Sequence, residues 1–205
     1  MKHCGTQKLE TNRLVLRRFD VTDAQAMYLN WASDPEVTKY LTWPAHKSPE
    51  VSRAVLESWI PLYQKKDYYQ WAITLRESPG EPVGSIAAVR VDDDLSLVHI
   101  GYCLGKNWWH RGLMSEALAA VISFFFDQVG VNRVECRHDP RNPRSGMVMK
   151  ACGMRYEGTV RSADRNNQGV CDACLYGLLR SDRVSLSDQK DACTSHSAAE
   201  AQITV

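Results

Sequence analysis

The sequence predicts one α/β domain in which helices cover both faces of a mixed sheet. Short apolar runs of strand type alternate with segments whose apolar residues recur every three or four positions. Their order is strand, helices, three strands, helix, strand, helix and two strands, which is typical of a mixed sheet between helical layers. The 205 residues, 44% hydrophobic and 24% charged, can bury one substantial core.

Most of the expected strands, and three helices, lie in the first half of the chain. Alternation around Leu14 and Leu16 indicates the first strand, and Thr22 is the expected N-cap of the first helix. Pro44 ends the second helical segment because proline disfavours a helical residue before it. A turn over 78–81 joins two strands. The expected elements are a strand over 9–18, helices over 20–33, 34–40 and 48–65, and strands over 69–76, 82–91 and 96–104.

The second half is expected to contribute a long buried helix, a shorter helix and three strands. An apolar stripe begins at Met114 and stops at Gly130. Asn142 followed by proline is the order preferred at a helix start. Residues 182–205 are rich in Ser, Asp, Ala and Gln, which predicts a disordered tail. The expected elements are a helix over 114–130, a strand over 133–138, a helix over 142–153, and a hairpin of strands 154–161 and 170–179 around the turn 166–169.

Composition and charge argue against several classes of protein. The formal net charge of +1 provides none of the positive footprint of a nucleic-acid-binding protein. The longest apolar stretch, 117–126, is too short to cross a bilayer, and residues 1–8 lack the apolar segment of a signal peptide. We therefore expect a cytoplasmic protein, a monomer or homodimer, with no membrane and no direct nucleic-acid partner.

The 7 cysteines are scattered through the chain and odd in number, which predicts buried free thiols rather than a disulfide framework. Cys171 and Cys174 have C-x-x-C spacing, but they lie in an expected strand, where residues three apart point to opposite faces. The histidines and acidic residues lack the spacing of metal ligands. No metal site is expected.

The stretch WHRGLMSEA, residues 109–117, joins an expected strand to the long buried helix. The first turn of a helix has unpaired backbone N–H groups and the positive end of the helix dipole, so this junction can bind an anion. The alternative is a capped helix that binds no ligand.

Four blocks of sequence, in this order, resemble one known family. They are TNRLVLRRF at 11–19, YLTWPAHKS at 40–48, IGYCLGKNWWHRGLMSEAL at 100–118 and RVECRHDPRNPRSGMVMKACGMRYEGTV at 133–160. Together they resemble the GNAT superfamily of acetyl-CoA-dependent N-acetyltransferases, and within it the RimJ/RimL-type group that acetylates protein N-termini. The resemblance implies a GNAT domain over residues 8–181 and acetyl-CoA as co-substrate.

The family's phosphate signature, Q/R-x-x-G-x-G/A, falls on the junction before the long helix. Met114 departs from the small residue at the last position of the signature. By resemblance, the backbone N–H groups of this loop bind the pyrophosphate of acetyl-CoA, Arg111 adds positive charge, and Gly112 permits close approach. The implied phosphate-binding residues are Trp109, His110, Arg111, Gly112, Leu113, Met114 and Ser115.

The same resemblance implies a V-shaped gap between the strand 100–104 and the strand 134–138. Backbone groups of Tyr102, Cys103 and Leu104 would pair with the pantetheine arm, and the N–H of Cys103 or Leu104 would hold the thioester oxygen. A nucleophilic role for Cys103 is the rival interpretation, which we reject because the family transfers acetyl directly to the amine.

Asn142 and Ser145 match the N-x-x-S of the group. Asn142 is expected to cap its helix and to bond the pantetheine amide. Many relatives have a tyrosine four residues after the serine to protonate the departing thiolate, but Met149 stands there in this chain. Ser145 or a water is then the expected proton donor, the alternative being an ordinary serine of a first helical turn.

The general base has two candidates, Glu157 and His99. His138 is interpreted instead as a core histidine. Trp43 is expected to line the acceptor site, unless it is a buried structural residue, and Asp172 is a candidate partner of the substrate amine.

The expected reaction is acetylation of a primary amine, first of all the N-terminal α-amine of a ribosomal or other protein or peptide. Alternatives are a small amine such as an aminoglycoside, polyamine or amino acid, and a non-catalytic acyl-CoA-binding module, which the departures at Met114 and Met149 motivate.

Overall fold

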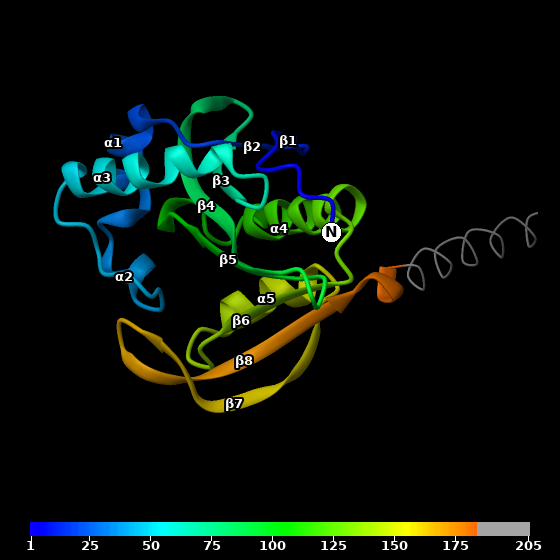
Figure 1. The fold of residues 1–205 in the computed structure, drawn as a ribbon. Helices are drawn as coiled ribbons and strands as arrows, with labels where there is room; N and C mark the ends of the chain where they lie inside the picture. The colour runs from blue at the N-terminus through cyan, green and yellow to red at the C-terminus, as the bar shows by residue number, and fades with distance from the viewer. Residues whose placement is uncertain (184–205) are drawn as a thin grey trace, which may run out of the picture.

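The computed structural model describes residues 1–183, which form an open mixed sheet with helices on both faces (Figure 1), as predicted. The sheet has 8 strands in the order β1-β2-β3-β4-β5-β6-β8-β7. Its neighbours are antiparallel except for β5 and β6, which are parallel. The strands are β1 (Leu9–Glu10), β2 (Leu14–Arg17), β3 (Gln70–Leu75), β4 (Ser78–Asp92), β5 (Leu97–Leu104), β6 (Arg133–His138), β7 (Arg155–Asn166) and β8 (Gly169–Leu179).

Helices α1, α2 and α3 lie on one side of the sheet, and α4 and α5 lie on the other (Figure 1). Two segments of π-helix and three of 3-10 helix extend or connect them. No helix in the described part of the chain combines the length and the apolar character that crossing a membrane requires. The α-helices are α1 (Ala24–Met27), α2 (Pro35–Thr38), α3 (Pro49–Trp59), α4 (Leu113–Phe124) and α5 (Pro143–Ala151).

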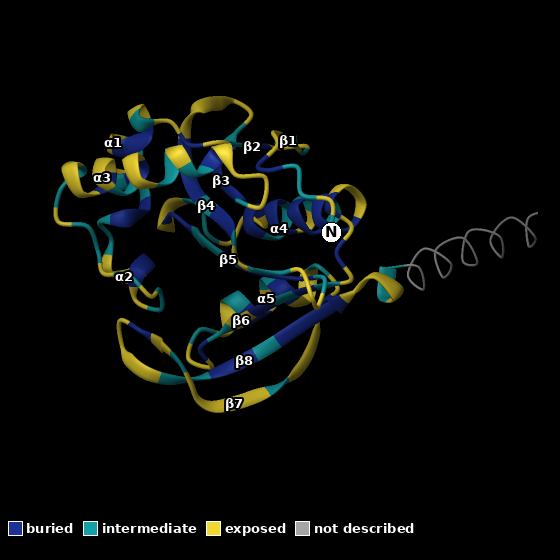
Figure 2. Ribbon diagram, in the orientation of Figure 1, coloured by how far each residue is buried: buried dark blue, intermediate teal, exposed yellow. Residues whose placement is uncertain are grey.

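The main hydrophobic core lies between the sheet and α4. Alternate residues of β5, among them Val98 and Ile100, point toward this layer and pack with the buried stripe of α4. Trp71 of β3 meets Phe124 and Phe125 in edge-on contacts with ring centroids 5.5 and 6.1 Å apart. Strand β7 is by contrast largely exposed, as Figure 2 shows.

The centre of the sheet opens after a short parallel ladder. β5 and β6 pair only at Leu97 with Arg133, Val98 with Val134 and His99 with Glu135. Beyond His99, β5 continues against β4 as far as Leu104, while β6 continues against β8. The V-shaped gap expected between these two strands is therefore present.

Several predicted boundaries are wrong for local reasons. The strand expected over 9–18 is a short hairpin, because Thr11 and Leu14 bond each other across a turn. The first helix is capped by Asp20, whose carboxylate accepts from the Thr22 N–H, so Thr22 is not the cap. The turn expected over 78–81 lies instead at 76–77, and 78–81 begin β4.

The predicted helix over 20–33 changes type twice along its length. A 3-10 turn over Val21–Asp23 precedes α1, and a π-helical turn over Tyr28–Ala32 follows it.

The disordered tail was predicted to start at residue 182, which is too early. Asp182 pairs with Arg155 at 3.0 Å and Arg183 with Asp127 at 2.8 Å, and the rest of that segment lies outside the described residues.

Candidate active site

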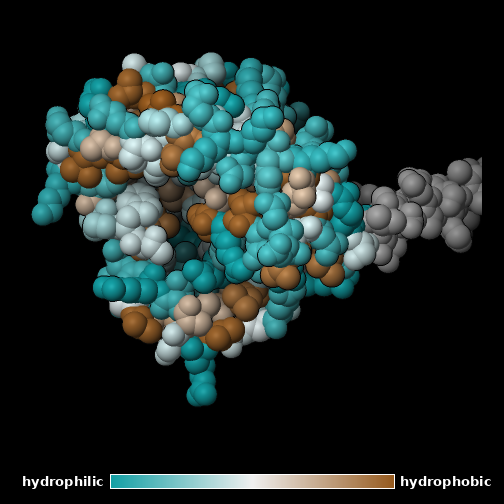
Figure 3. All heavy atoms as spheres, in the orientation of Figure 1, coloured by the Kyte–Doolittle hydropathy of each residue, from teal (hydrophilic) through white to brown (hydrophobic). Residues whose placement is uncertain are grey.

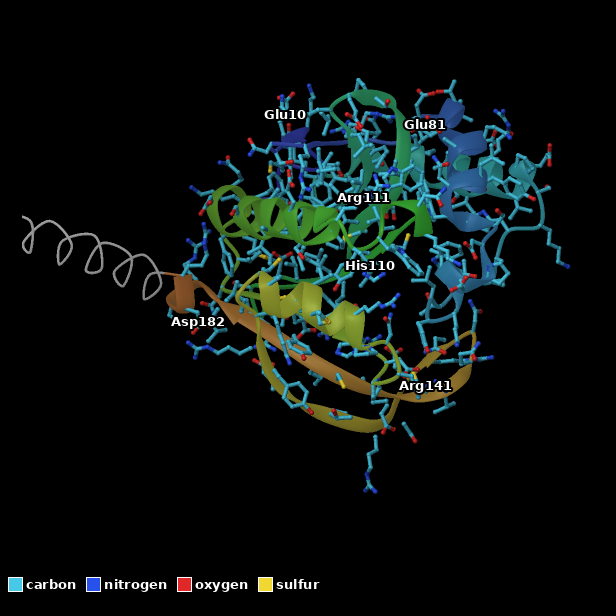
Figure 4. All side chains as sticks on the ribbon, turned by 180° about the vertical axis from the view of Figure 1, so that it is seen from behind. Glu10, Glu81, His110, Arg111, Arg141 and Asp182 are labelled. Carbon is cyan, nitrogen blue, oxygen red and sulfur yellow. The ribbon has the colours of Figure 1, made fainter. Side chains whose placement is uncertain are left out.

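A cavity of about 710 Å³ lies where β5 ends and where α4 and α5 begin. It extends past the gap in the sheet to α2 on the other side. Figure 4 shows His110 and Arg111 on the loop before α4, and Arg141 on the loop before α5. The predicted cofactor residues that line it are Tyr102, Cys103, Leu104, Trp109, His110, Gly112, Leu113, Met114, Ser115, Asn142 and Ser145, so the fold brings together every predicted cofactor residue except Arg111.

The loop before α4 has the backbone of an anion site. His110 and Gly112 both adopt left-handed conformations, with φ of +60° and +70°, and Gly112 is the N-cap of α4. Among the described residues, no side chain caps the first turn of this helix. Its N–H groups therefore remain available to a phosphate, which fits the pyrophosphate of acetyl-CoA.

Two side chains of this segment have structural contacts. Trp109 Nε1 donates to the carbonyl of Leu104 at 2.7 Å, which ties the loop to the end of β5. Met114 is 7% exposed and belongs to the core under α4, although it also borders the cavity. The larger residue at the last position of the signature is thus accommodated by the core.

Tyr102 and Ser145 meet across the cavity. Tyr102 Oη donates to the backbone carbonyl of Ser145 at 3.0 Å and lies 3.1 Å from the Ser145 hydroxyl. Burial raises the pKa of Tyr102, so the phenol keeps its proton. Met149, by contrast, is 1% exposed in the core. A role for the Tyr102 side chain was missed from the sequence, although strand alternation places it on the α5 side of β5.

Asn142 stands at the N-cap of α5 by position, but none of its side-chain atoms makes a capping bond within the described residues. The expectation of a side-chain cap is therefore wrong, and the amide is left to face the cavity. The loop before it is held by Asp139, whose carboxylate accepts from Arg141 Nε at 2.9 Å and from Asn166 Nδ2 at 2.8 Å. Arg141 lowers the pKa of Asp139 well below its ordinary range.

His99 lies at the closed end of the gap, on the face opposite α4 and α5. Its Nδ1 is 3.2 Å from Glu135 Oε1, the residue it pairs with in the parallel ladder. Burial lowers the pKa of His99, and Glu135 opposes that shift less strongly. With Nδ1 engaged by the carboxylate, Nε2 is the nitrogen that can accept a proton. Glu135 was missed from the sequence, although alternation in β6 places it on this face.

Glu157 is placed differently from the other candidate base. It lies on β7 and accepts from Arg133 Nη1 at 2.7 Å, and this guanidinium lowers the pKa of the carboxylate. Neither Glu157 nor His99 is among the residues that line the large cavity. Arg133 also lies 3.4 Å from Glu135, so the acids on this face share one arginine.

Comparison with known proteins identifies the fold. A family model described as an acetyltransferase (GNAT) domain matches residues 13–155. The chain belongs to the GNAT family. It is accordingly an acetyl-CoA-dependent N-acetyltransferase, and the suspected likeness to the RimJ/RimL-type group is supported by the relatives.

Three similar proteins illustrate the likeness. An uncharacterized N-acetyltransferase, p20, of Bacillus licheniformis is 28% identical over 85% of this chain and 97% of its own length. A ribosomal-protein-serine acetyltransferase of Escherichia coli is 29% identical over 68% of this chain and 76% of its own. The fold also matches, with a TM-score of 0.74 and 20% identity over 82% of this chain and 93% of the other, a microcin C7 self-immunity acetyltransferase solved in complex with acetyl-CoA and AMP.

In this GNAT domain Cys103 has the properties of a structural thiol. Burial raises its pKa to about 11, and its Sγ lies 3.8 Å from the Ser85 hydroxyl. Cys171 and Cys174 bond different partners, Asn166 and Thr159, and remain free thiols. Within residues 1–183 no group of His, Cys, Asp and Glu is arranged to hold a metal, while Cys193 lies outside the described residues.

A second cavity, of about 700 Å³, lies between the segment after α2 and the tip of the β7–β8 hairpin. Figure 3 shows the surface hollowed between the layer of α1 to α3 and the strands β7 and β8. This cavity is lined by Thr42, Pro44, Asp164, Arg165, Asn166, Asn167 and Gly169. Asn167 Nδ2 donates to the carbonyls of Thr38 at 2.8 Å and Trp43 at 2.7 Å, so the hairpin tip is tied to the segment after α2.

The two predicted substrate residues, Trp43 and Asp172, lie outside both cavities. The Trp43 ring packs against His46, with centroids 5.2 Å apart, and Asp172 accepts from the Ser162 N–H at 2.9 Å.

His138 is half-buried beneath α5, as a core histidine would be, but its Nε2 is a buried atom without a hydrogen-bond partner among the described residues.

Proposed function

We propose that this GNAT enzyme acetylates an α-amine at the N-terminus of a protein or peptide, with a ribosomal protein as the first candidate. The observation that carries the proposal is the pairing of His99 Nδ1 with Glu135 Oε1 at 3.2 Å, at the closed end of the gap, where burial lowers the pKa of His99. A base that is neutral at pH 7 and weak suits an α-amine with a pKa near 8, about one-tenth of which is already neutral. A lysine amine near 10.4 is neutral in well under one molecule per thousand and needs a stronger base.

Acetyl-CoA supplies the acetyl group as a thioester. The N–H groups of the loop from His110 to Ser115 would hold its phosphates, and the backbone of Cys103 or Leu104 would hold the thioester oxygen. His99 Nε2 would accept the amine proton, with Glu135 orienting the ring through Nδ1. Glu157 is the alternative base, acting directly or through water.

Ser145 is proposed to donate a proton to the leaving sulfur. Tyr102 lies 3.1 Å from its hydroxyl; because burial raises the pKa of the phenol, Tyr102 stays protonated and holds the serine by hydrogen bonding, while water returns the proton to the serine. This pair would replace the tyrosine of other family members, since Met149 is packed into the core. Asn142, with its amide free of a capping bond, would bind the pantetheine arm.

The name of the Escherichia coli relative supports a ribosomal acceptor, and the open hollow beside Thr42 and Pro44 can admit the end of a chain. Asp172 and Trp43 remain proposed contacts of the acceptor. A small amine is the second candidate because the same hollow is lined by the carboxylate of Asp164.

The test is a panel of acceptors assayed by release of the CoA thiol and by the mass of the product. The panel contains peptides beginning with Ser, Ala or Met, the same peptides formylated at the α-amine but bearing a free lysine, and spermidine and an aminoglycoside. Turnover restricted to the free α-amines is expected. Faster turnover of lysine or of the small amines would refute the proposed acceptor, and turnover of none of them would favour a binding module.

A further inference from the structure

The turn between β1 and β2 reaches across the sheet edge to the start of α4. In the described part of the chain, the carboxylate of Glu116, in the first turn of α4, accepts its hydrogen bonds from this hairpin. Its Oε1 accepts from the Thr11 hydroxyl at 2.6 Å and from the Arg13 backbone N–H at 2.9 Å. Its Oε2 accepts from Arg13 Nε at 2.7 Å. The carboxylate is thus saturated by residues more than one hundred positions away in sequence.

Arg13 has a second partner, which belongs to the phosphate loop. Its Nη1 donates to the carbonyl of Arg111 at 2.8 Å. Arg111 stands between the two left-handed residues, His110 and Gly112. A left-handed conformation is unfavourable for a residue other than glycine, so it persists at His110 only where the surroundings enforce it. The bond from Arg13 is such a constraint.

The geometry of the peptide links this bond to the cavity. In a trans peptide the carbonyl of one residue and the N–H of the next point in opposite directions. With the Arg111 carbonyl held by Arg13, the N–H of Gly112 points away from Arg13. Gly112 borders the cavity, and Arg13 is not among the residues that line it.

We infer that Arg13 and Glu116 form a clasp that orients the phosphate-binding loop, with Arg13 as a positioning residue for acetyl-CoA. Arg13 does not act as a phosphate ligand, because its charge is matched by Glu116 at 2.7 Å. An unpaired arginine would attract phosphate through its charge. Because Glu116 pairs with the Arg13 guanidinium, Arg13 contributes instead by holding the backbone of the loop in place. This inference rests on the proposed phosphate loop.

The test compares Arg13→Ala with Arg76→Ala. Arg76, in the turn after β3, is a matched control, because it is similarly exposed and bonds the same hairpin, at Glu10 (3.1 Å) and at the Thr11 carbonyl (2.5 Å), without touching the phosphate loop. For each variant, the kinetic constants are measured with acetyl-CoA and with acetylpantetheine, which lacks the phosphates. Arg13→Ala is expected to raise the KM for acetyl-CoA about tenfold while leaving kcat and the kcat/KM for acetylpantetheine within about twofold.

Arg76→Ala is expected to leave both substrates unchanged. Arg13→Lys keeps the charge but cannot bond Glu116 and the Arg111 carbonyl with the same fork, so its KM should resemble that of Arg13→Ala. A normal KM in Arg13→Ala, full rescue by lysine, or an equal rise in Arg76→Ala would each overturn the clasp. Failure of the wild-type protein to bind CoA in a calorimetric titration would refute the phosphate loop itself, which separates the two hypotheses.

Discussion

Replacing Gly112 by alanine should separate a cost in stability from a loss of cofactor binding. Gly112 has φ of +70°, and a Cβ there would meet only Arg13 Nη2, at 3.6 Å, within the described residues. The change therefore costs backbone strain of about 1–2 kcal/mol without a collision. For a domain of this size, each kcal/mol lowers the Tm by roughly 2–4 °C.

Gly130 provides the matched control. Gly130 also adopts a left-handed conformation, with φ of +82°. No heavy atom of the described residues lies within 4 Å of the position that a Cβ would take there. It follows the π-helical turn after α4, away from the cavity. Gly130→Ala should lose the same stability as Gly112→Ala.

The two variants should differ in their kinetics. Gly112 borders the cavity, and relief of the strain at position 112 would turn the N–H groups of the loop away from the phosphates, so the KM for acetyl-CoA should rise about tenfold, a loss of about 1.4 kcal/mol. Thermal unfolding and steady-state kinetics on both proteins measure these effects. An unchanged KM in Gly112→Ala, or the same increase in Gly130→Ala, would show that the loop does not receive the phosphates.

Three further outcomes are expected. Ser145→Ala and Tyr102→Phe should each lower kcat about 100-fold, and the double variant should fall no further than the worse single one, because the two hydroxyls act as one donor. A pH–rate profile should show activity lost as the pH falls below 6.5 and His99 takes up a proton, and His99→Gln should abolish that limb along with most of kcat. Met149→Tyr should lower the Tm without raising kcat, since the side chain is packed in the core and cannot reach the cavity.

The parts of the molecule that follow from local pattern were predictable from the sequence. The apolar stripe from Met114 onward predicted the buried helix, which begins at Leu113. The predicted bounds of the first strand were wrong because a side chain forms a hydrogen bond across a turn. The Thr11 side chain bonds Leu14 and bends what looks like one strand into two, a contact that periodicity does not register.

In the candidate site, too, some features were predicted from the sequence and others were not. The family resemblance predicted the residues that contribute backbone groups, and they lie together around one cavity. The side-chain pairs depend on which strands become neighbours: Tyr102 meets Ser145 only because β5 faces α5, and Glu157 meets Arg133 only because β7 doubles back on β8. Such pairings join residues 43 and 24 positions apart, beyond the reach of any local signal.

The brevity of the parallel ladder has a mechanical consequence. Strands β1 to β5 form one antiparallel block and β6 to β8 form another, and within the sheet they are paired by a ladder from Leu97 to His99, while the Asn167 N–H bonds the Leu41 carbonyl at the far end. The second block, with α5, is built from segments adjacent in sequence, as is typical of a unit that can open on its own. The angle between the two blocks is therefore fixed at two places, by the short ladder at one end of the gap and by the bonds of Asn167 at the other.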